Sequence, residues 1–200
     1  ALVSNVGSAE ARNTGLQISS RDYLFFLDID DKCNLEVLKE AYLELLNRPS
    51  DLLVANLAIE SSYQTLDMPL IVSETTKTSI SSVSERFIQC MGYSRIIYSR
   101  SFVERNKLRF YPTRTEMNKA QFVLDDAFWV ILVSSAKGDL LITPTDRIIY
   151  LYNQPTSNPE AWQRYLAQLL ILPEICLNFI AEFMKYDSLD ILILKRNTFR

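Results

Sequence analysis

The sequence predicts an α/β fold with a helical C-terminal appendage. Short apolar runs typical of buried strands alternate with segments whose apolar residues recur at helical spacing. The clearest pair is the apolar run over 23–27 and the amphipathic pattern over 34–47. Near the C-terminus two helix starts follow one another, at Asn158-Pro159 and at Pro173-Glu174. The 200 residues are therefore expected to hold an α/β domain over 1–157 and a helical extension over 158–200.

The first half is expected to open with a helix over 8–19, for which Ser8 is a plausible N-cap. The run Tyr23–Leu27 predicts a fully buried strand, and it ends abruptly in Asp28-Ile29-Asp30-Asp31. Such a strand would deliver acidic side chains to the carboxyl edge of a sheet, where α/β proteins place ligands. The helix over 34–47 and a strand over 52–59 come next. Residues 61–86 are rich in Ser and Thr and predict loop and short helix.

The second half is predicted to continue this alternation. The expected elements are a strand over 94–98, short helix over 102–106, helix over 122–135, strands over 140–143 and 147–152, and helices over 159–172 and 173–186. The two C-terminal helices carry more apolar surface than a free pair needs, and Lys195, Arg196 and Arg200 follow them. We expect them to dock on their own domain, on a partner subunit or on the cytoplasmic face of a membrane.

The composition excludes several classes of function. The net charge is -3 and the isoelectric point is near 5.1, which gives no electrostatic case for binding nucleic acid. There is no histidine, so Ser-His-Asp and Cys-His nucleophile systems and His-ligated zinc or iron are excluded. A general base near neutral pH must then be a carboxylate or, less commonly, Lys, Tyr or Cys. Any metal must be a hard cation bound by oxygen, such as magnesium, manganese or calcium.

The cysteines and the hydropathy pattern indicate the compartment. Cys33, Cys90 and Cys176 lie far apart and form no CxxC pair, as expected of thiols in a reducing environment. We expect no signal peptide at the start of the chain, and no apolar run in the sequence reaches the roughly 18 residues that a membrane span needs. We expect a cytoplasmic protein, free or resting on the inner face of the membrane.

The residues around the acidic run carry a more specific signal. Asn5-x-Gly7 precedes Ala11-Arg12-Asn13-x-Gly15, and the next strand reads YLFFLDIDD up to Asp31. This pattern closely resembles the family 2 glycosyltransferases. Two later segments resemble that family in its order, SRIIYSRSFVERNKLRF over 94–110 and LDDAF over 124–128. The resemblance implies a GT-A-like fold containing part of a Rossmann-type nucleotide-binding sheet. It also implies inverting transfer from a nucleotide diphosphate sugar to a saccharide or polysaccharide-precursor acceptor.

The family chemistry implies roles for the residues in the first motif. Negative charge builds on the departing diphosphate, and a Mg²⁺ or Mn²⁺ ion held by carboxylates neutralises it. Asp30 would be the direct ligand, while Asp28 would bind the metal through water or hold the ribose. Arg12 would contact phosphate or order the acidic loop through an internal salt bridge. Asn13 is a hydrogen-bonding residue assigned with them to cofactor binding, and Asp31 is expected to be structural, as a cap of the next helix.

The acceptor hydroxyl must lose a proton, and Asp125 and Asp126 are the candidate bases in a chain without histidine. Two adjacent carboxylates near a cleft can raise one another's pKa toward a useful value. Adjacent positions on a helix point about 100° apart, so only one of them can face the sugar. The resemblance assigns Asp125, because Phe128 then falls at the family spacing. A register shift of one residue would make Asp126 the base.

Two alternatives to this enzyme remain. The family begins with two strands that end in Pro-x-Tyr/Phe-Asn and Asp-x-Ser, and neither pattern precedes Ala1. We therefore expect an N-terminally incomplete domain, and a non-catalytic binding module derived from a glycosyltransferase is one alternative. The other is a phosphohydrolase of the haloacid dehalogenase type, whose first motif is also an apolar strand followed by Asp-x-Asp. That motif continues with Gly-Thr, where this chain has Asp31-Lys32.

Overall fold

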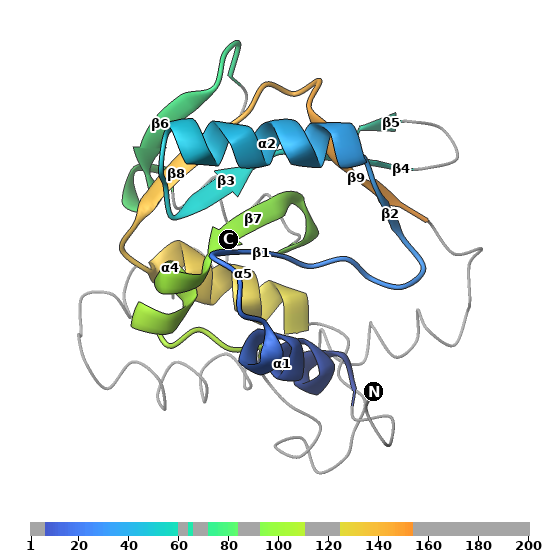
Figure 1. The fold of residues 1–200 in the computed structure, drawn as a ribbon, viewed down its shortest axis with the longest axis vertical. Coiled ribbons are helices and arrows are strands. Elements are labelled where there is room, and N and C mark those ends of the chain that lie inside the picture. Colours follow the sequence, from blue (N-terminus) through green and yellow to red (C-terminus); the bar gives the residue numbers. More distant parts are fainter. Residues whose placement is uncertain (1–6, 60–63, 66–71, 84–92, 111–124, 154–200) are drawn as a thin grey trace, which may run out of the picture.

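The computed structural model describes residues 7–59, 64–65, 72–83, 93–110 and 125–153 (Figure 1). The helices expected over 159–172 and 173–186, and with them the proposed extension over 158–200, lie outside the described residues. Within the described part, no helix is both long enough and apolar enough to cross a bilayer. The elements form two mixed sheets with helices packed against them, which confirms the predicted α/β class.

The larger sheet contains five strands in the order β1-β7-β3-β8-β6. Its strands are β1 (Tyr23–Phe25), β3 (Leu52–Val54), β6 (Thr76–Ser79), β7 (Ile96–Ser99) and β8 (Asp139–Ile142). Strands β3 and β8 run parallel, and the other neighbours run antiparallel. The three central strands are almost entirely buried, as expected for a sheet that is covered on both faces.

The smaller sheet contains four strands in the order β2-β9-β4-β5. Its strands are β2 (Lys32–Cys33), β4 (Asn56–Ile59), β5 (Gln64–Thr65) and β9 (Ile148–Tyr152). The single strand predicted over 52–59 is divided between the two sheets at Ala55. The Ala55 N–H donates to the Arg95 carbonyl at 3.0 Å, and the Asn56 N–H donates to the Arg147 carbonyl at 2.9 Å. One extended segment thus changes partners halfway, which local sequence does not reveal.

The larger sheet separates two layers of helices (Figure 1). The helices are α1 (Ser8–Ile18), α2 (Leu35–Asn47), α4 (Arg100–Arg105) and α5 (Asp125–Ser135), with a 3₁₀ turn η1 (Tyr93–Arg95). Alternate residues of each central strand point to opposite faces. Leu53, Ile97 and Leu141 share a core with α2, while their strand neighbours share the other core with α1, α4 and α5.

The apolar run after Arg21 was predicted to be a fully buried strand, and this is wrong. In the described structure β1 lies at the edge of the larger sheet and pairs only with β7, so Tyr23 and Phe25 are only partly buried. The run is apolar for another reason. Phe26 leaves the strand, and its ring packs edge-on against an aromatic cluster below the sheet. We call this the aromatic cluster and define it as Phe26, Tyr93, Tyr98, Phe110 and Trp129.

Two further local predictions need correction. The N-cap of α1 is Gly7, at a φ of 89°, and no side chain caps that end, so Ser8 is the first helical residue. The segment 61–86 was predicted as loop and short helix; residues 80–83 are indeed helical, but the segment also contributes β5 and β6, which were not predicted. Strand β6 is an edge strand of mostly exposed or half-buried polar residues, so it lacks the apolar alternation that marks a strand in sequence.

Candidate functional site

The acidic run forms a tight turn directly after β1. The Asp31 N–H donates to the Asp28 carbonyl at 3.1 Å, which places Ile29 and Asp30 at the two central positions of a β-turn. The Ile29 side chain is fully exposed, and Asp30 is exposed beside it. Because nothing apolar is buried at the tip, the position of this acidic turn depends on what holds its two ends.

The first end is held through the Asp28 carboxylate. Its Oδ1 accepts a hydrogen bond from Arg12 Nη2 at 2.9 Å, and its Oδ2 accepts one from the Tyr93 hydroxyl at 2.5 Å. The Arg12 guanidinium also donates to the Tyr93 hydroxyl. Its Cζ lies 4.2 Å from the Tyr93 ring centroid and 5.3 Å from that of Phe110, within the range of cation–π attraction. Arg12 therefore orders the acidic turn through an internal salt bridge, and a phosphate contact stays a prediction.

The second end is held through the Asp31 carboxylate. The Tyr150 hydroxyl donates to its Oδ2, and the Asn153 N–H donates to its Oδ1 at 2.8 Å. The same hydroxyl accepts from the Asp28 N–H at 3.4 Å, so Tyr150 joins the first and last residues of the turn. Burial raises the pKa of Asp31, while the hydrogen bonds from Tyr150 and Asn153 act in the opposite direction.

The expectation that Asp31 caps the next helix is wrong. The N-cap of α2 is Asn34, whose side-chain oxygen accepts from the N–H groups of Glu36 and Val37 at 3.2 and 3.3 Å. Asp31 lies outside the cap, and its oxygens are used by Tyr150 and Asn153. It is structural, as predicted, but it stabilises the turn and not the helix.

Asn13 binds the backbone of Phe110, a residue that packs next to the site. Its amide accepts from the Phe110 N–H at 2.7 Å and donates to the Phe110 carbonyl at 2.9 Å. This pair of bonds fixes the backbone of Phe110, whose ring lies beneath the Arg12 guanidinium. Asn13 is thus a hydrogen-bonding residue as expected, although its partner is distant in sequence. Its role in cofactor binding stays a prediction.

Tyr93 and Tyr150 were not singled out by the sequence. Both are buried residues, at 6% and 1% exposure, and burial is the largest cause that raises the pKa of each hydroxyl above 10.0. Each hydroxyl therefore stays protonated at neutral pH and donates to a carboxylate. Their surroundings in the sequence, MGYSR and IIYLY, match ordinary core aromatics. No local signal distinguishes them.

The candidate bases lie at the start of α5, which begins at Asp125. Their side chains are outside the described part of the structure, so the roles of Asp125 and Asp126 stay predictions. Helix α5 itself is anchored close to the site. It lies side by side with η1, and the ring of its Trp129 stacks on Phe110 at a centroid distance of 4.1 Å.

The donor set of the acidic turn fits a metal ion that arrives with its substrate. In the described ranges, no group of three or more His, Cys, Asp or Glu side chains gathers as a metal cage would. The turn offers Asp30, which is exposed, and Asp28, whose side chain is 38% exposed. Magnesium is commonly held by one or two carboxylates together with substrate phosphates and water. The carboxylates present suit that arrangement and not an all-protein site.

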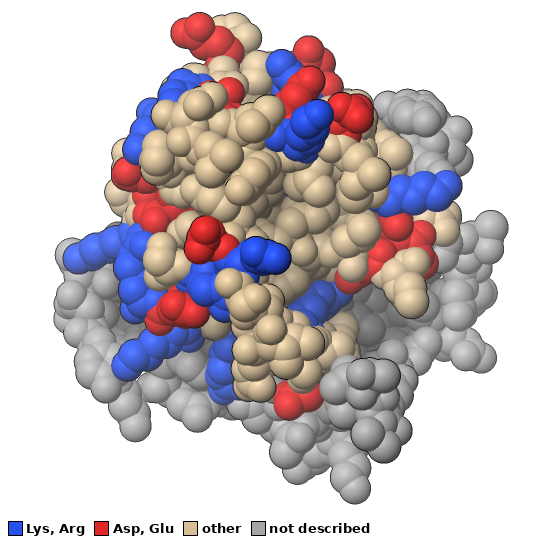
Figure 2. Space-filling model, in the orientation of Figure 1, with Lys and Arg blue, Asp and Glu red and all other residues tan. Residues whose placement is uncertain are grey.

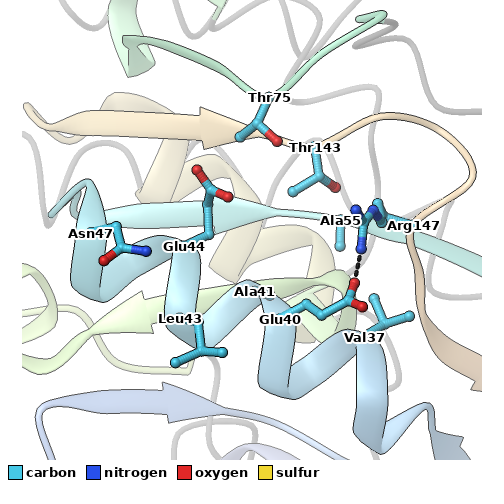
Figure 3. A pocket seen from close by; sticks show the side chains of 10 residues that line it. All are labelled: Val37, Glu40, Ala41, Leu43, Glu44, Asn47, Ala55, Thr75, Thr143 and Arg147. Carbon is cyan, nitrogen blue, oxygen red and sulfur yellow. Dashed lines mark ion pairs between the residues drawn. The ribbon is translucent and has the colours of Figure 1, made fainter.

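A pocket of about 270 Å³ lies elsewhere, between α2 and the ends of β6 and β8 (Figure 3). Glu40 of α2 forms an ion pair with Arg147 across it. Glu44 accepts from Arg48 Nε at 2.6 Å on the same helix. Both acids that line the pocket are therefore paired, and none of the residues singled out by the sequence lines it.

The mixed α/β architecture is that of a GT-A-type glycosyltransferase domain. The family model described as glycosyl transferase family 2 matches residues 2–132, and the chain belongs to this family. The resemblance found in the sequence is thereby confirmed. The match favours the glycosyltransferase interpretation over the haloacid dehalogenase alternative.

Individual relatives agree with this assignment. The chain is 25% identical over 158 residues to poly(ribitol-phosphate) beta-N-acetylglucosaminyltransferase TarP of Staphylococcus aureus (strain N315), covering 78% of this chain and 46% of TarP. It superposes on S. aureus TarS 1–349 in complex with UDP-GlcNAc with a TM-score of 0.64 at 18% identity, covering 78% and 42% of the two chains. For the TarS 1–349 complex with UDP, the TM-score is 0.59 at 18% identity, and the match covers 74% of this chain and 40% of TarS 1–349. The likeness to TarS confirms the GT-A-like fold, and the chain spans less than half of each of these relatives.

Proposed function

We propose that this protein is a nucleotide-sugar-dependent glycosyltransferase that moves a sugar from a nucleotide diphosphate sugar to a saccharide or polysaccharide-precursor acceptor. The observation that carries the proposal is the acidic turn, which presents Asp30 to solvent in the segment that matches the family. TarP is named for transfer of N-acetylglucosamine to poly(ribitol phosphate), and TarS is described in complex with UDP-GlcNAc. UDP-GlcNAc and a polyol phosphate polymer are therefore the first donor and acceptor to test.

Within this proposal the acidic turn is the metal and donor site. A bound Mg²⁺ or Mn²⁺ ion neutralises the charge that builds on the departing diphosphate. Asp30 holds the ion directly, while Asp28 contacts it through water or holds the ribose. Arg12 fixes the orientation of the Asp28 carboxylate through its salt bridge. Arg12 and Asn13 border the donor phosphates in the same proposal.

The acceptor side of the reaction is assigned to the start of α5. Asp125 takes the proton of the attacking hydroxyl, and transfer proceeds with inversion, while Asp126 turns toward structural contacts. Support comes from the lack of any histidine in the chain and from the family spacing between Asp125 and Phe128.

We also propose that the protein works in the cytoplasm and that the segment 159–186 docks on the catalytic domain, a partner subunit or the inner membrane face. Support is limited to the sequence, in which that segment is rich in Leu, Ile and Phe and is followed by basic residues.

The test of the proposed function compares two aspartates at equivalent turn positions in the full-length protein. Asp146 is exposed and occupies the third position of a turn closed by the Arg147 N–H and the Pro144 carbonyl at 3.1 Å, as Asp30 does in the acidic turn. We expect Asp30→Asn to lower Mn²⁺-dependent transfer from UDP-GlcNAc by at least about 100-fold, because a direct ligand matters more than the groups around it. Asp146→Asn should retain wild-type activity.

Chelation of the wild-type protein with EDTA should reproduce the loss seen in Asp30→Asn. Full activity of that variant, or of the chelated protein, would contradict the metal assignment. Binding of UDP-GlcNAc without any transfer would support the non-catalytic alternative.

A further inference from the structure

We propose that Tyr93 and Tyr150 are positioning residues that hold the acidic turn in the conformation that binds a cation and diphosphate. We call the two hydroxyls the tyrosine clamp. This inference rests on the proposed function and deepens it, because it identifies what orders the donor site before the donor arrives.

The two ends of the acidic turn are held from different parts of the fold. Tyr93 belongs to η1, which leads into β7 of the larger sheet, and its hydroxyl donates to Asp28 Oδ2 at 2.5 Å. Tyr150 belongs to β9 of the smaller sheet, and its hydroxyl donates to Asp31 Oδ2. The turn therefore spans the junction of the two sheets, and its shape depends on both.

Each clamp hydroxyl donates its one proton to a carboxylate and also accepts a hydrogen bond. The Tyr93 oxygen accepts from Arg12, and the Tyr150 oxygen accepts from the Asp28 N–H at 3.4 Å. A guanidinium N–H and a backbone N–H can only donate, so each hydroxyl proton must point toward its carboxylate partner. The clamp consequently has one hydrogen-bonding arrangement, which favours a single geometry of the turn.

The clamp rings are packed independently of their hydroxyls. The Tyr93 ring lies edge-on to Phe26 and Phe110 at centroid distances of 5.9 and 5.5 Å, and the Tyr150 ring lies edge-on to Phe25 at 6.3 Å. A phenylalanine at either position keeps these contacts and removes the hydroxyl alone. Substitution by Phe is therefore a clean test of the clamp.

The effect on ligand binding follows from the exposure of Asp30. Within the described ranges its side chain has no hydrogen bond or ion pair, so only the ends of the turn hold it in place. Ordering a mobile turn on binding costs conformational entropy, which the clamp removes in advance. Loss of the clamp should weaken binding of ground state and transition state alike. Such a loss raises KM and leaves kcat unchanged.

The experiment measures the dissociation constant of UDP in the presence of saturating Mn²⁺ by calorimetry on the full-length protein. We expect Tyr150→Phe and Tyr93→Phe each to raise this constant by about 10-fold, the lower end of the range for groups that orient metal ligands. The KM for UDP-GlcNAc should rise by the same factor, and kcat should stay within about twofold of wild type.

Tyr98→Phe is the matched control. The Tyr98 hydroxyl is fully buried, accepts from Trp129 Nε1 at 2.9 Å and donates to the Tyr93 carbonyl at 3.2 Å. Its loss should lower thermal stability through a buried hydrogen bond without touching the acidic turn. An unchanged UDP dissociation constant in this variant shows that a general loss of stability does not explain the effect of the clamp.

Three outcomes would overturn the inference. Wild-type affinity of Tyr150→Phe for Mn²⁺ and UDP would exclude the clamp while leaving the proposed function intact. A wild-type protein that binds no Mn²⁺ and UDP would overturn the proposed function itself. If Tyr150→Phe folds poorly, Tyr93→Phe removes the other clamp hydroxyl, and unchanged affinity in that variant would also exclude the clamp.

Discussion

The acidic turn and the pocket beside α2 both contain a carboxylate paired with an arginine, but the two pairs have different surroundings. In the turn, Arg12 is 15% exposed and lies over the Tyr93 ring while it binds Asp28. Beside α2, the side chains of Arg147 and Glu40 are 47% and 54% exposed. An exposed pair contributes at most about 1 kcal/mol, because water screens it and both side chains lose freedom. Charge-assisted bonds shielded from water contribute more and fix a geometry.

The apolar residues near the two regions are also arranged differently. Below the acidic turn, four rings of the aromatic cluster are buried and Phe26 is partly buried, and the Tyr93 and Phe110 rings lie against the Arg12 guanidinium. On α2 the apolar side chains of Leu35, Tyr42 and Leu46 are 45–69% exposed, and Figure 2 shows an uncharged surface there with charged groups around it. Buried rings therefore organise the polar groups of the site, whereas the surface of α2 leaves its ion pairs to solvent.

The largest effect is expected from removal of the stacked ring below the site. Trp129 is fully buried, so Trp129→Ala should lower the free energy of unfolding by about 3–5 kcal/mol. The comparison variant is Tyr42→Ala on the exposed face of α2, which should change the free energy of unfolding by less than about 1 kcal/mol. Urea unfolding followed by circular dichroism measures both. Equal losses of unfolding free energy in the two variants would show that the aromatic cluster contributes no more to stability than the α2 surface.

A smaller effect is expected from removal of the two arginines. Arg12→Met should lower the free energy of unfolding by about 1–3 kcal/mol, because the partly buried Asp28 carboxylate loses a charge-assisted partner. Arg147→Met should cost less than about 1 kcal/mol. Added salt should reduce the contribution of the exposed pair more than that of the shielded one. Equal salt dependence in the two variants would contradict the contrast between the regions.

The smallest effect concerns pH. Burial raises the pKa of the Tyr98 hydroxyl in the folded protein, whereas the unfolded chain titrates near 10.0. The folded state then holds the proton more tightly, so stability is fully present below pH 10 and is lost as the pH rises above it. At about pH 11 the free energy of unfolding has fallen by roughly 1.4 kcal/mol for one such group.

Tyr98→Phe removes that titration, so the stability gap between wild type and variant should narrow between about pH 9 and 11. Unfolding by urea at the two pH values measures the gap. A constant gap would mean that the folded and unfolded states of Tyr98 titrate alike.

The sequence by itself determined the class of the fold, the family and the location of the acidic turn. The helical spacing from Leu35 onward predicted α2, and the apolar runs predicted most strands. These signals act between residues a few positions apart, where side-chain periodicity and capping bonds operate, so they can be read without the rest of the chain.

Only the tertiary structure decided how the acidic turn is held. Tyr93 and Tyr150 lie 65 and 119 residues beyond the carboxylates that they bind, and each looks like an ordinary core aromatic in sequence. The edge position of β1 and the change of sheet at Ala55 were likewise decided by contacts between segments far apart in the sequence. Such contacts depend on which strands pair and how two sheets meet, and both are settled by packing over the whole domain, where local propensity carries no information.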